Sequence, residues 1–168
     1  MSDRPRVFVS RILPGGDAPG SPLATLRAHA DVDVWEPDLP PSADALRTRA
    51  AGCDGLLTVL TERVDSALLD TSPRVRVVAN MAVGYDNIDV PACTERGVLV
   101  TNTPGVLTEA TADMTWALLL AAARRLPEGD RALRGGDWGP WHPTWLLGHR
   151  VSGATLGIVG PGRIGRAV

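Results

Sequence analysis

The chain has 168 residues, enough for one ordinary domain with a hydrophobic core of fair size. Its net charge is −2 and its arginines form no cluster, which argues against a nucleic-acid or anionic-membrane partner. Residues 1–5 contain no apolar signal core, and the longest apolar stretch, Trp116 to Ala123, is too short to cross a bilayer. We therefore expect a cytoplasmic protein with no nucleic-acid and no membrane partner.

Strand-like and helix-like runs alternate over the first hundred residues. The expected helices open on polar residues that can cap them, as in Ser21-Pro22. Such alternation is typical of βαβ units with right-handed crossovers, so we predict an α/β fold, a small doubly wound lobe around a parallel sheet. Strands are expected at residues 7–9, 32–35, 55–59, 75–79 and 98–100, and helices after Ser21, after Ser42, from Ser66 to Leu69, and between Asp89 and Gly97.

The pattern changes after Leu107. A single long helix is predicted from Thr108 to Arg125; because it is apolar nearly all round, we expect it to be buried on several sides. Pro127 should end it, and a shorter helix should follow over residues 128–134. The loop at residues 137–145 holds three tryptophans, which predicts that this loop packs against another surface.

A glycine-rich fingerprint closes the chain. Residues 156–159 read as a central parallel strand, and a helix should begin near Arg163. In such a turn the glycines permit a tight bend, close approach of a pyrophosphate, and contact between helix and strand. The alternative is an ordinary structural turn. The predicted phosphate-binding positions are Gly160, Pro161, Gly162, Arg163, Ile164 and Gly165.

Taken in this order, the predicted elements and motifs of the chain resemble those of the D-isomer-specific 2-hydroxyacid dehydrogenases. The resemblance is closest to their glyoxylate/hydroxypyruvate reductase branch. The resemblance extends along the chain and is strongest from Asn80 onward. The matching segments are residues 7–11, 55–61, 83–89, 102–108 and 124–127, the tryptophan loop, and residues 160–165.

The resemblance implies a flavodoxin-like substrate lobe and a Rossmann lobe that binds NAD or NADP, with hydride transferred to carbon 2 of a small 2-oxo acid. In the family a histidine–glutamate pair moves the proton and an arginine holds the carboxylate, and all three lie beyond residue 168. We therefore expect a homodimeric parent protein that reduces glyoxylate or hydroxypyruvate, and no activity from this chain alone. The expected divisions are a substrate lobe (1–101), an interlobe and dimerisation segment (102–150), and the start of the cofactor domain (151–168).

The resemblance also assigns individual roles. Val83 and Gly84 follow a strand end, where successive backbone N–H groups can hold a carboxylate, although a tight turn without a ligand is the alternative. Leu60 and Asn80 are expected at neighbouring loop ends of the same substrate site. The Thr108 hydroxyl should approach the nicotinamide side of the cofactor or cap its helix. Trp141 should close the partner subunit's substrate pocket or simply pack in the dimer.

The remaining titratable residues are expected to be structural. Asp86 and Asp89 are interpreted as turn and N-cap acids. Cys53 and Cys93 lack metal-ligand spacing and should be buried, reduced thiols, so no metal site is expected. The histidines at positions 29, 142 and 149 have no matching carboxylate partner and should lie on surfaces or loops.

Two other functions remain open at this point. The same scaffold could serve as a non-enzymatic, dinucleotide-sensing regulator like the C-terminal-binding-protein corepressors. Alternatively, the 168-residue product could act only by pairing with longer subunits. Fold analogy alone does not choose between these functions. A downstream His–Glu pair and activity on oxo acids would favour the reductase.

Overall fold

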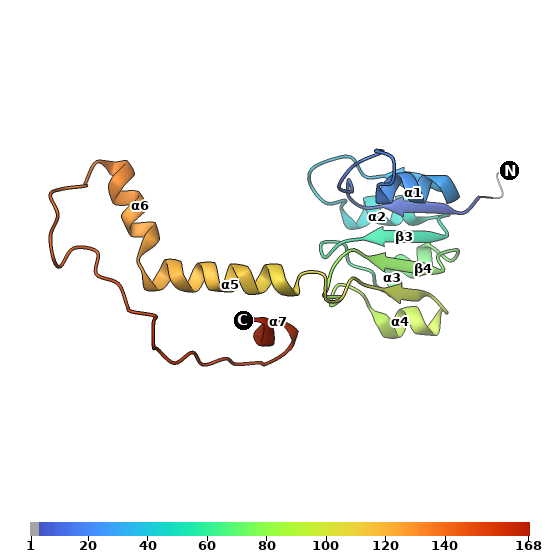
Figure 1. Ribbon diagram of the computed structural model, residues 1–168. Helices are drawn as coiled ribbons and strands as arrows, with labels where there is room; N and C mark the ends of the chain where they lie inside the picture. Colours follow the sequence, from blue (N-terminus) through green and yellow to red (C-terminus); the bar gives the residue numbers. More distant parts are fainter. Residues whose placement is uncertain (1–3) are drawn as a thin grey trace. The chain divides into compact units, whose positions relative to one another are not determined.

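The computed structural model describes residues 4–168, so the first three residues of the polar N-terminus lie outside the described part. The chain forms two compact units, which we call the N-terminal unit (Met1–Pro104) and the C-terminal unit (Gly105–Val168), and each is described by itself (Figure 1). No helix among residues 4–168 is long and apolar enough to cross a membrane.

The N-terminal unit is built on a parallel sheet of five strands in the order β2-β1-β3-β4-β5. This order and the alternating helices confirm the predicted doubly wound α/β fold, of the flavodoxin-like type. The register places Val9 of β1 beside Val34 of β2 and Leu57 of β3. The strands are β1 (Arg6–Val9), β2 (Asp31–Val34), β3 (Gly55–Thr58), β4 (Val77–Asn80) and β5 (Leu99–Thr101).

Four helices connect the strands, and their caps agree with the sequence. Ser21 and Ser42 accept hydrogen bonds from backbone N–H groups in the first turns of α1 and α2, and Asp89 does the same for α4. For α3 the cap is Asp65, so the helix starts at the predicted residue but runs two residues further than predicted. The helices are α1 (Pro22–His29), α2 (Ala43–Ala50), α3 (Ser66–Thr71) and α4 (Val90–Glu95).

The helices cover the two faces of the sheet unequally. The larger core joins Phe8, Leu56 and Val78 of the sheet to apolar residues of α2, α3 and α4. On the other face, Val9 and Leu13 pack with Leu23 of α1. Because the helices after β1 and β3 lie on opposite faces, the carboxyl ends of these two neighbouring strands form the switch point of the sheet, where ligands bind in open α/β folds.

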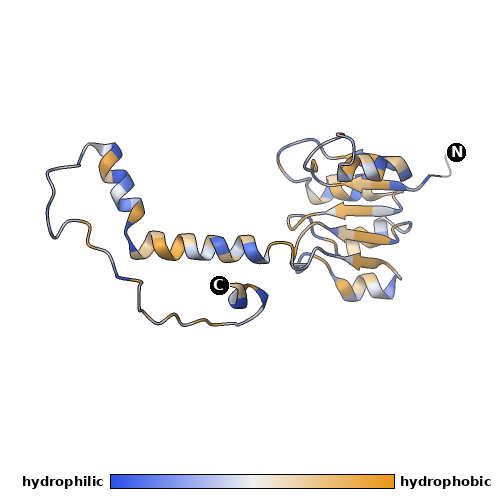
Figure 2. Ribbon diagram, in the orientation of Figure 1, coloured by the Kyte–Doolittle hydropathy of each residue, from blue (hydrophilic) through white to orange (hydrophobic). Residues whose placement is uncertain are grey.

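The C-terminal unit contains α5 (Thr108–Ala123), α6 (Leu126–Gly135) and α7 (Arg163–Ala167). The long helix begins at Thr108 as predicted, but the expectation that it is buried on several sides is wrong for this chain. Ala112 is its one buried residue, and Figure 2 shows that the residues of its C-terminal half are mostly hydrophobic. Within this unit α7 lies against α5, where the indole Nε1 of Trp116 donates to the carbonyl of Val168 at 2.9 Å.

Three further expectations in this unit need correction. Pro127 does not end α5: it stands in the first turn of α6, and the break comes at Arg125, which has a left-handed φ of 56°. Trp138 and Trp145 make an edge-to-face contact with ring centroids 5.0 Å apart, yet all three tryptophans of the loop remain exposed. Residues 156–159 form no strand, because a parallel strand needs a neighbouring backbone and no segment within residues 4–168 pairs with them.

Candidate functional site

The predicted substrate residues of the N-terminal unit meet at the carboxyl ends of β3 and β4. Thr58 and Asn80 end these strands and stand opposite each other in the register. Both are buried, and the Thr58 hydroxyl donates to Oδ1 of Asn80 at 3.0 Å. Their pairing leaves the amide nitrogen of Asn80 to organise the loop that follows β4.

That loop turns its carbonyls toward two asparagines. Nδ2 of Asn80 donates to the Gly84 carbonyl at 2.9 Å, and Nδ2 of Asn102 donates to the Val83 carbonyl at 2.8 Å. Within residues 4–168, no group accepts a hydrogen bond from the backbone N–H of Val83 or of Gly84. The two successive N–H groups are therefore free donors beside fixed carbonyls, the arrangement that binds an anion in a backbone nest.

Leu60, in the loop after β3, supplies the apolar side of this site. Its side chain is 60% exposed although it is large and apolar. Its Cδ2 atom would lie 3.7 Å from a Cβ atom built at Gly84, which is ordinary van der Waals contact. The missing side chain at Gly84 therefore leaves the space beside Leu60 open.

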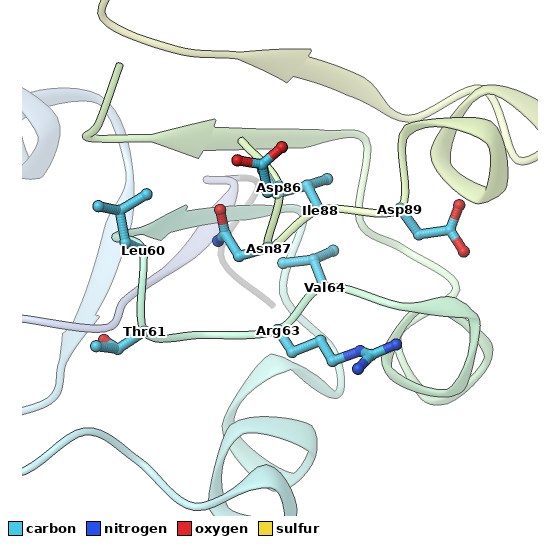
Figure 3. A pocket seen from close by; sticks show the side chains of 8 residues that line it. All are labelled: Leu60, Thr61, Arg63, Val64, Asp86, Asn87, Ile88 and Asp89. Carbon is cyan, nitrogen blue, oxygen red and sulfur yellow. The ribbon is translucent and has the colours of Figure 1, made fainter. Parts of the chain in front are cut away.

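An open cavity of about 440 Å³ adjoins Leu60 on the side of α3 and α4. Figure 3 shows that its lining comes from two loops, residues 60–64 and 86–89. A parallel bridge between Val64 and Ile88 joins these loops. The cavity is lined by neither Val83 nor Gly84, so the nest itself lies outside it.

Of the two aspartates beside the cavity, Asp89 has the structural role expected of it. Oδ1 of Asp89 accepts the backbone N–H of Ala92 at 2.9 Å, which confirms that Asp89 caps α4. Asp86 is exposed at the cavity wall. No group of three or more histidines, cysteines or acidic residues within residues 4–168 has the arrangement of a metal site.

Sequence reasoning missed a polar cluster at the switch point, made by the buried residues Ser10 and Glu62 and the half-buried Arg11. Glu62 is 2% exposed, and its Oε2 atom accepts the Ser10 hydroxyl at 2.6 Å. These residues are 52 positions apart. The only signal in the sequence is an acidic residue soon after an apolar strand, which a surface loop would show equally well.

The predicted cofactor residues lie in the C-terminal unit. Gly160 has a left-handed φ of 86°, a conformation that glycine adopts without strain. The N–H of Gly162 donates back to the Gly160 carbonyl at 2.8 Å, and α7 starts at Arg163 as predicted. A Cβ atom at Gly162 would meet nothing within 4 Å, whereas one at Gly165 would collide with the Gly160 carbonyl oxygen. This tight turn, with open space beside Gly162, suits a pyrophosphate; Pro161 and Ile164 complete it.

Thr108 and Trp141 belong to the same unit. Thr108 is the first residue of α5, but the N-cap is Leu107 and no side chain caps the helix, so the cap interpretation of Thr108 is wrong. Trp141 is 86% exposed, which gives it no packing role within this chain.

The histidines and cysteines match their predicted surroundings. The histidines at positions 29, 142 and 149 are exposed. Cys53 and Cys93 are buried and unpaired. Burial raises the pKa of both thiols, because a thiolate loses its hydration in the protein interior.

Comparison with known proteins decides the family. The model of the D-isomer specific 2-hydroxyacid dehydrogenase catalytic domain matches residues 16–157. The chain belongs to this family. It is 50% identical over 169 residues to the glyoxylate reductase of Thermococcus kodakarensis, which covers 98% of this chain and 49% of that protein.

Two solved structures share the fold of this chain. The TT0316 protein of Thermus thermophilus superposes with a TM-score of 0.88 at 46% identity, over 96% of this chain and 50% of that one. The NADPH-dependent glyoxylate/hydroxypyruvate reductase of Sinorhizobium meliloti, solved with NADP and malonate, gives 0.69 at 32% identity, over 98% of this chain and 48% of that one. The chain thus spans about half the length of the relatives it matches.

Proposed function

We propose that the N-terminal unit is the substrate-binding part of an NAD(P)-dependent reductase of glyoxylate or hydroxypyruvate. The observation that carries this proposal is the pair of free backbone N–H groups at Val83 and Gly84. Successive free backbone N–H donors can bind a carboxylate, the group that all 2-oxo acids share. The names of the relatives support the choice of glyoxylate and hydroxypyruvate.

Leu60 and Gly84 then set the size of the substrate. Leu60 gives an apolar wall opposite the nest, and the absent side chain at Gly84 lets a short acid approach the backbone. The chain contributes binding and orientation of the oxo acid. No histidine among residues 4–168 forms an ion pair with a carboxylate, so on this proposal the proton donor lies outside the described residues. On this proposal the 168-residue chain alone is inactive.

The turn at residues 160–165 is the proposed NAD(P) site. Gly160 and Gly165 keep the turn tight, and Gly162 leaves the space that a pyrophosphate would fill. The cofactor, when bound, supplies the hydride. Thr108, the first residue of α5, is the proposed contact on the nicotinamide side.

Association of two copies through the C-terminal unit belongs to the same proposal. Leu118, Leu133 and Trp141 are exposed, and apolar surfaces of this kind are covered in oligomers. In the dimer Trp141 would close the partner subunit's substrate pocket. The buried, free cysteines Cys53 and Cys93 agree with a reducing, cytoplasmic location.

A hybrid protein tests the activity. Residues 1–168 are joined to the C-terminal half of the Thermococcus kodakarensis relative, and oxidation of NADH and NADPH is followed with glyoxylate, hydroxypyruvate and glycolaldehyde. Glycolaldehyde is the control because it has no carboxylate. Turnover of both acids, with none for glycolaldehyde or for the 168-residue chain, is expected. Equal turnover of glycolaldehyde by the hybrid would contradict a carboxylate nest, and turnover by the chain alone would contradict the assigned division of roles.

A further inference from the structure

The buried carboxylate of Glu62 lies at the switch point of the sheet, beside but not within the proposed substrate site. Its side chain has no exposed area. Oε2 accepts the Ser10 hydroxyl at 2.6 Å and the Val59 backbone N–H at 2.9 Å, and Oε1 accepts the Thr61 hydroxyl at 2.6 Å. These three hydrogen bonds fix the position of the carboxylate. The carboxylate in turn fixes the positions of the three donor groups.

The donors are distributed around Leu60. Val59 precedes Leu60 and Thr61 follows it, so one carboxylate fixes the residues on both sides of that leucine. Ser10 anchors the carboxylate to the end of β1, a strand inside the sheet. Leu60 is thereby held although its own side chain is largely exposed.

Arg11 balances the charge of this buried group. Its Nε atom lies 4.0 Å from Oε1 of Glu62. The two terminal nitrogens donate to the Asp38 carbonyl at 2.6 Å and to the Thr61 hydroxyl at 3.4 Å. The guanidinium therefore bridges the loop after β2, at Asp38, and the loop after β3, at Thr61 and Glu62, and these contacts occupy its donors.

A second clamp ties the same loop to the nest. Nδ2 of Asn87 donates to the carbonyls of Val59 and Glu62 at 3.0 and 2.8 Å. Nδ2 of Asn80 contacts Oδ1 of Asn87 at 3.3 Å and also holds the Gly84 carbonyl. Asn87 thus holds the backbone of the loop that the Glu62 carboxylate fixes at Val59, and Asn80 joins Asn87 to the Gly84 carbonyl.

We infer that Glu62 is a positioning residue that holds Leu60 at a fixed distance from the free N–H groups of Val83 and Gly84. Because it is buried, Glu62 does not touch the substrate and acts through Leu60 and the Asn87–Asn80 pair. The inferred effect on Leu60 is independent of the reaction, whereas its consequence for substrate binding rests on the proposed function. This separation allows the two to be tested independently.

The first test uses the 168-residue chain and NMR signals of the Leu60 methyl groups and the Gly84 amide. Glu62→Gln keeps the shape but replaces one acceptor oxygen by a donor, so both signals should shift or broaden. Asp54→Asn is the matched control: Asp54 precedes β3, accepts the Arg6 N–H at 2.8 Å and pairs with Arg74 at 2.9 Å, at the other end of the strand. It should lower the melting temperature without moving either signal.

Unchanged Leu60 and Gly84 signals in folded Glu62→Gln would overturn the inference and leave Glu62 a stabilising residue only. If Glu62→Gln does not fold, Thr61→Val decides, since it removes one donor to the carboxylate with little change in shape. Thr61→Val should shift the Leu60 signals in the folded protein. Unshifted signals there would overturn the inference equally.

The second test uses the hybrid protein. Glu62→Gln should raise KM for glyoxylate about tenfold, with kcat and KM for NADPH little changed, because a displaced Leu60 weakens binding of the oxo acid alone. Asp54→Asn should leave all three constants near their original values. A Glu62→Gln hybrid that loses kcat with KM unchanged would overturn the positioning role. A hybrid with no oxo-acid activity would contradict the proposed function, and the NMR comparison would still decide the role of Glu62.

Discussion

The Leu60 side chain lies 3.7 Å from the point where a Cβ atom at Gly84 would stand, although 24 positions separate the two residues (84 − 60). The space beside Gly84 is thus a narrow gap that Leu60, in the loop after β3, bounds. The loop after β4, which holds Gly84, also carries the two free backbone N–H groups.

Gly84→Ala should fold normally, since the new Cβ would be in ordinary contact with its neighbours. Gly84→Val should fill the gap and weaken binding of the oxo acid by ~1.5–3 kcal/mol, about ten- to hundredfold in KM, if the carboxylate loses its N–H donors. Steady-state kinetics of the hybrid protein measure this, with KM for NADPH as the internal control. A Gly84→Val hybrid with unchanged KM for glyoxylate would show that the acid binds elsewhere.

Asn102 should matter through the Val83 carbonyl that it holds. Asn102→Asp replaces the donor by an acceptor and adds a negative charge near the proposed carboxylate, so KM for glyoxylate should rise about tenfold or more. Asn102→Ala removes the hydrogen bond without the charge and should have a smaller effect. Kinetics of both variants, with melting curves to verify folding, separate the two contributions. An equal increase in KM for glyoxylate in Asn102→Asp and Asn102→Ala would show that the added negative charge does not affect binding.

Gly162→Val should weaken binding of the cofactor and leave binding of the oxo acid unchanged. The space beside Gly162 is open in the turn, so the Gly162→Val variant should fold. Its valine side chain would occupy the proposed place of the pyrophosphate. Gly157→Val is the matched control, because a Cβ at Gly157 also meets nothing within 4 Å. Fluorescence titration of the hybrid protein with NADPH should show a loss of about tenfold or more for Gly162→Val alone. Equal losses for the two variants would contradict this placement.

The pKa of Asp54 is lowered by the Arg6 N–H that it accepts and by its hydrogen bond to Arg74. A lowered pKa in the folded state means that Asp54 stabilises the fold above its unfolded pKa of about 3.9, and that this contribution is lost as the pH falls through the folded-state pKa. Urea unfolding measures the free energy of unfolding at neutral and acidic pH. The difference in this free energy between the unsubstituted chain and Asp54→Asn should become smaller as the pH falls. A difference independent of pH would refute the linkage.

The isolated chain should unfold in a broad transition and associate, because apolar residues such as Leu118 and Val159 are exposed. Residues 156–159 form no strand, so their amides should exchange with solvent almost freely. Amides of β1 and β3, inside the sheet, should be protected. Hydrogen exchange and sedimentation measure both properties. A sharp transition of a monomer with protection at residues 156–159 would contradict the expectation.

The N-terminal unit was predictable because its signals are local. Caps such as Ser21 and Asp89 and short apolar strands identify their own elements. The strand at residues 156–159 was predicted wrongly. An apolar pattern indicates that a segment can form a strand beside another strand, and no adjacent strand pairs with it within residues 4–168. The burial predicted for α5 is wrong for the same reason. The role of Glu62 was not predicted, because it depends on a hydrogen bond from Ser10, which lies 52 positions away in the chain.

The central claim is that the N–H groups of Val83 and Gly84 bind the carboxylate of a 2-oxo acid. The most direct measurement is an NMR titration of the hybrid protein, labelled with nitrogen-15 at valine and glycine, with oxalate, an unreactive analogue that carries the same carboxylate. We predict saturable shifts of the Val83 and Gly84 amide signals, and their loss in Gly84→Val. Competitive inhibition by oxalate with both amide signals unmoved would contradict the account.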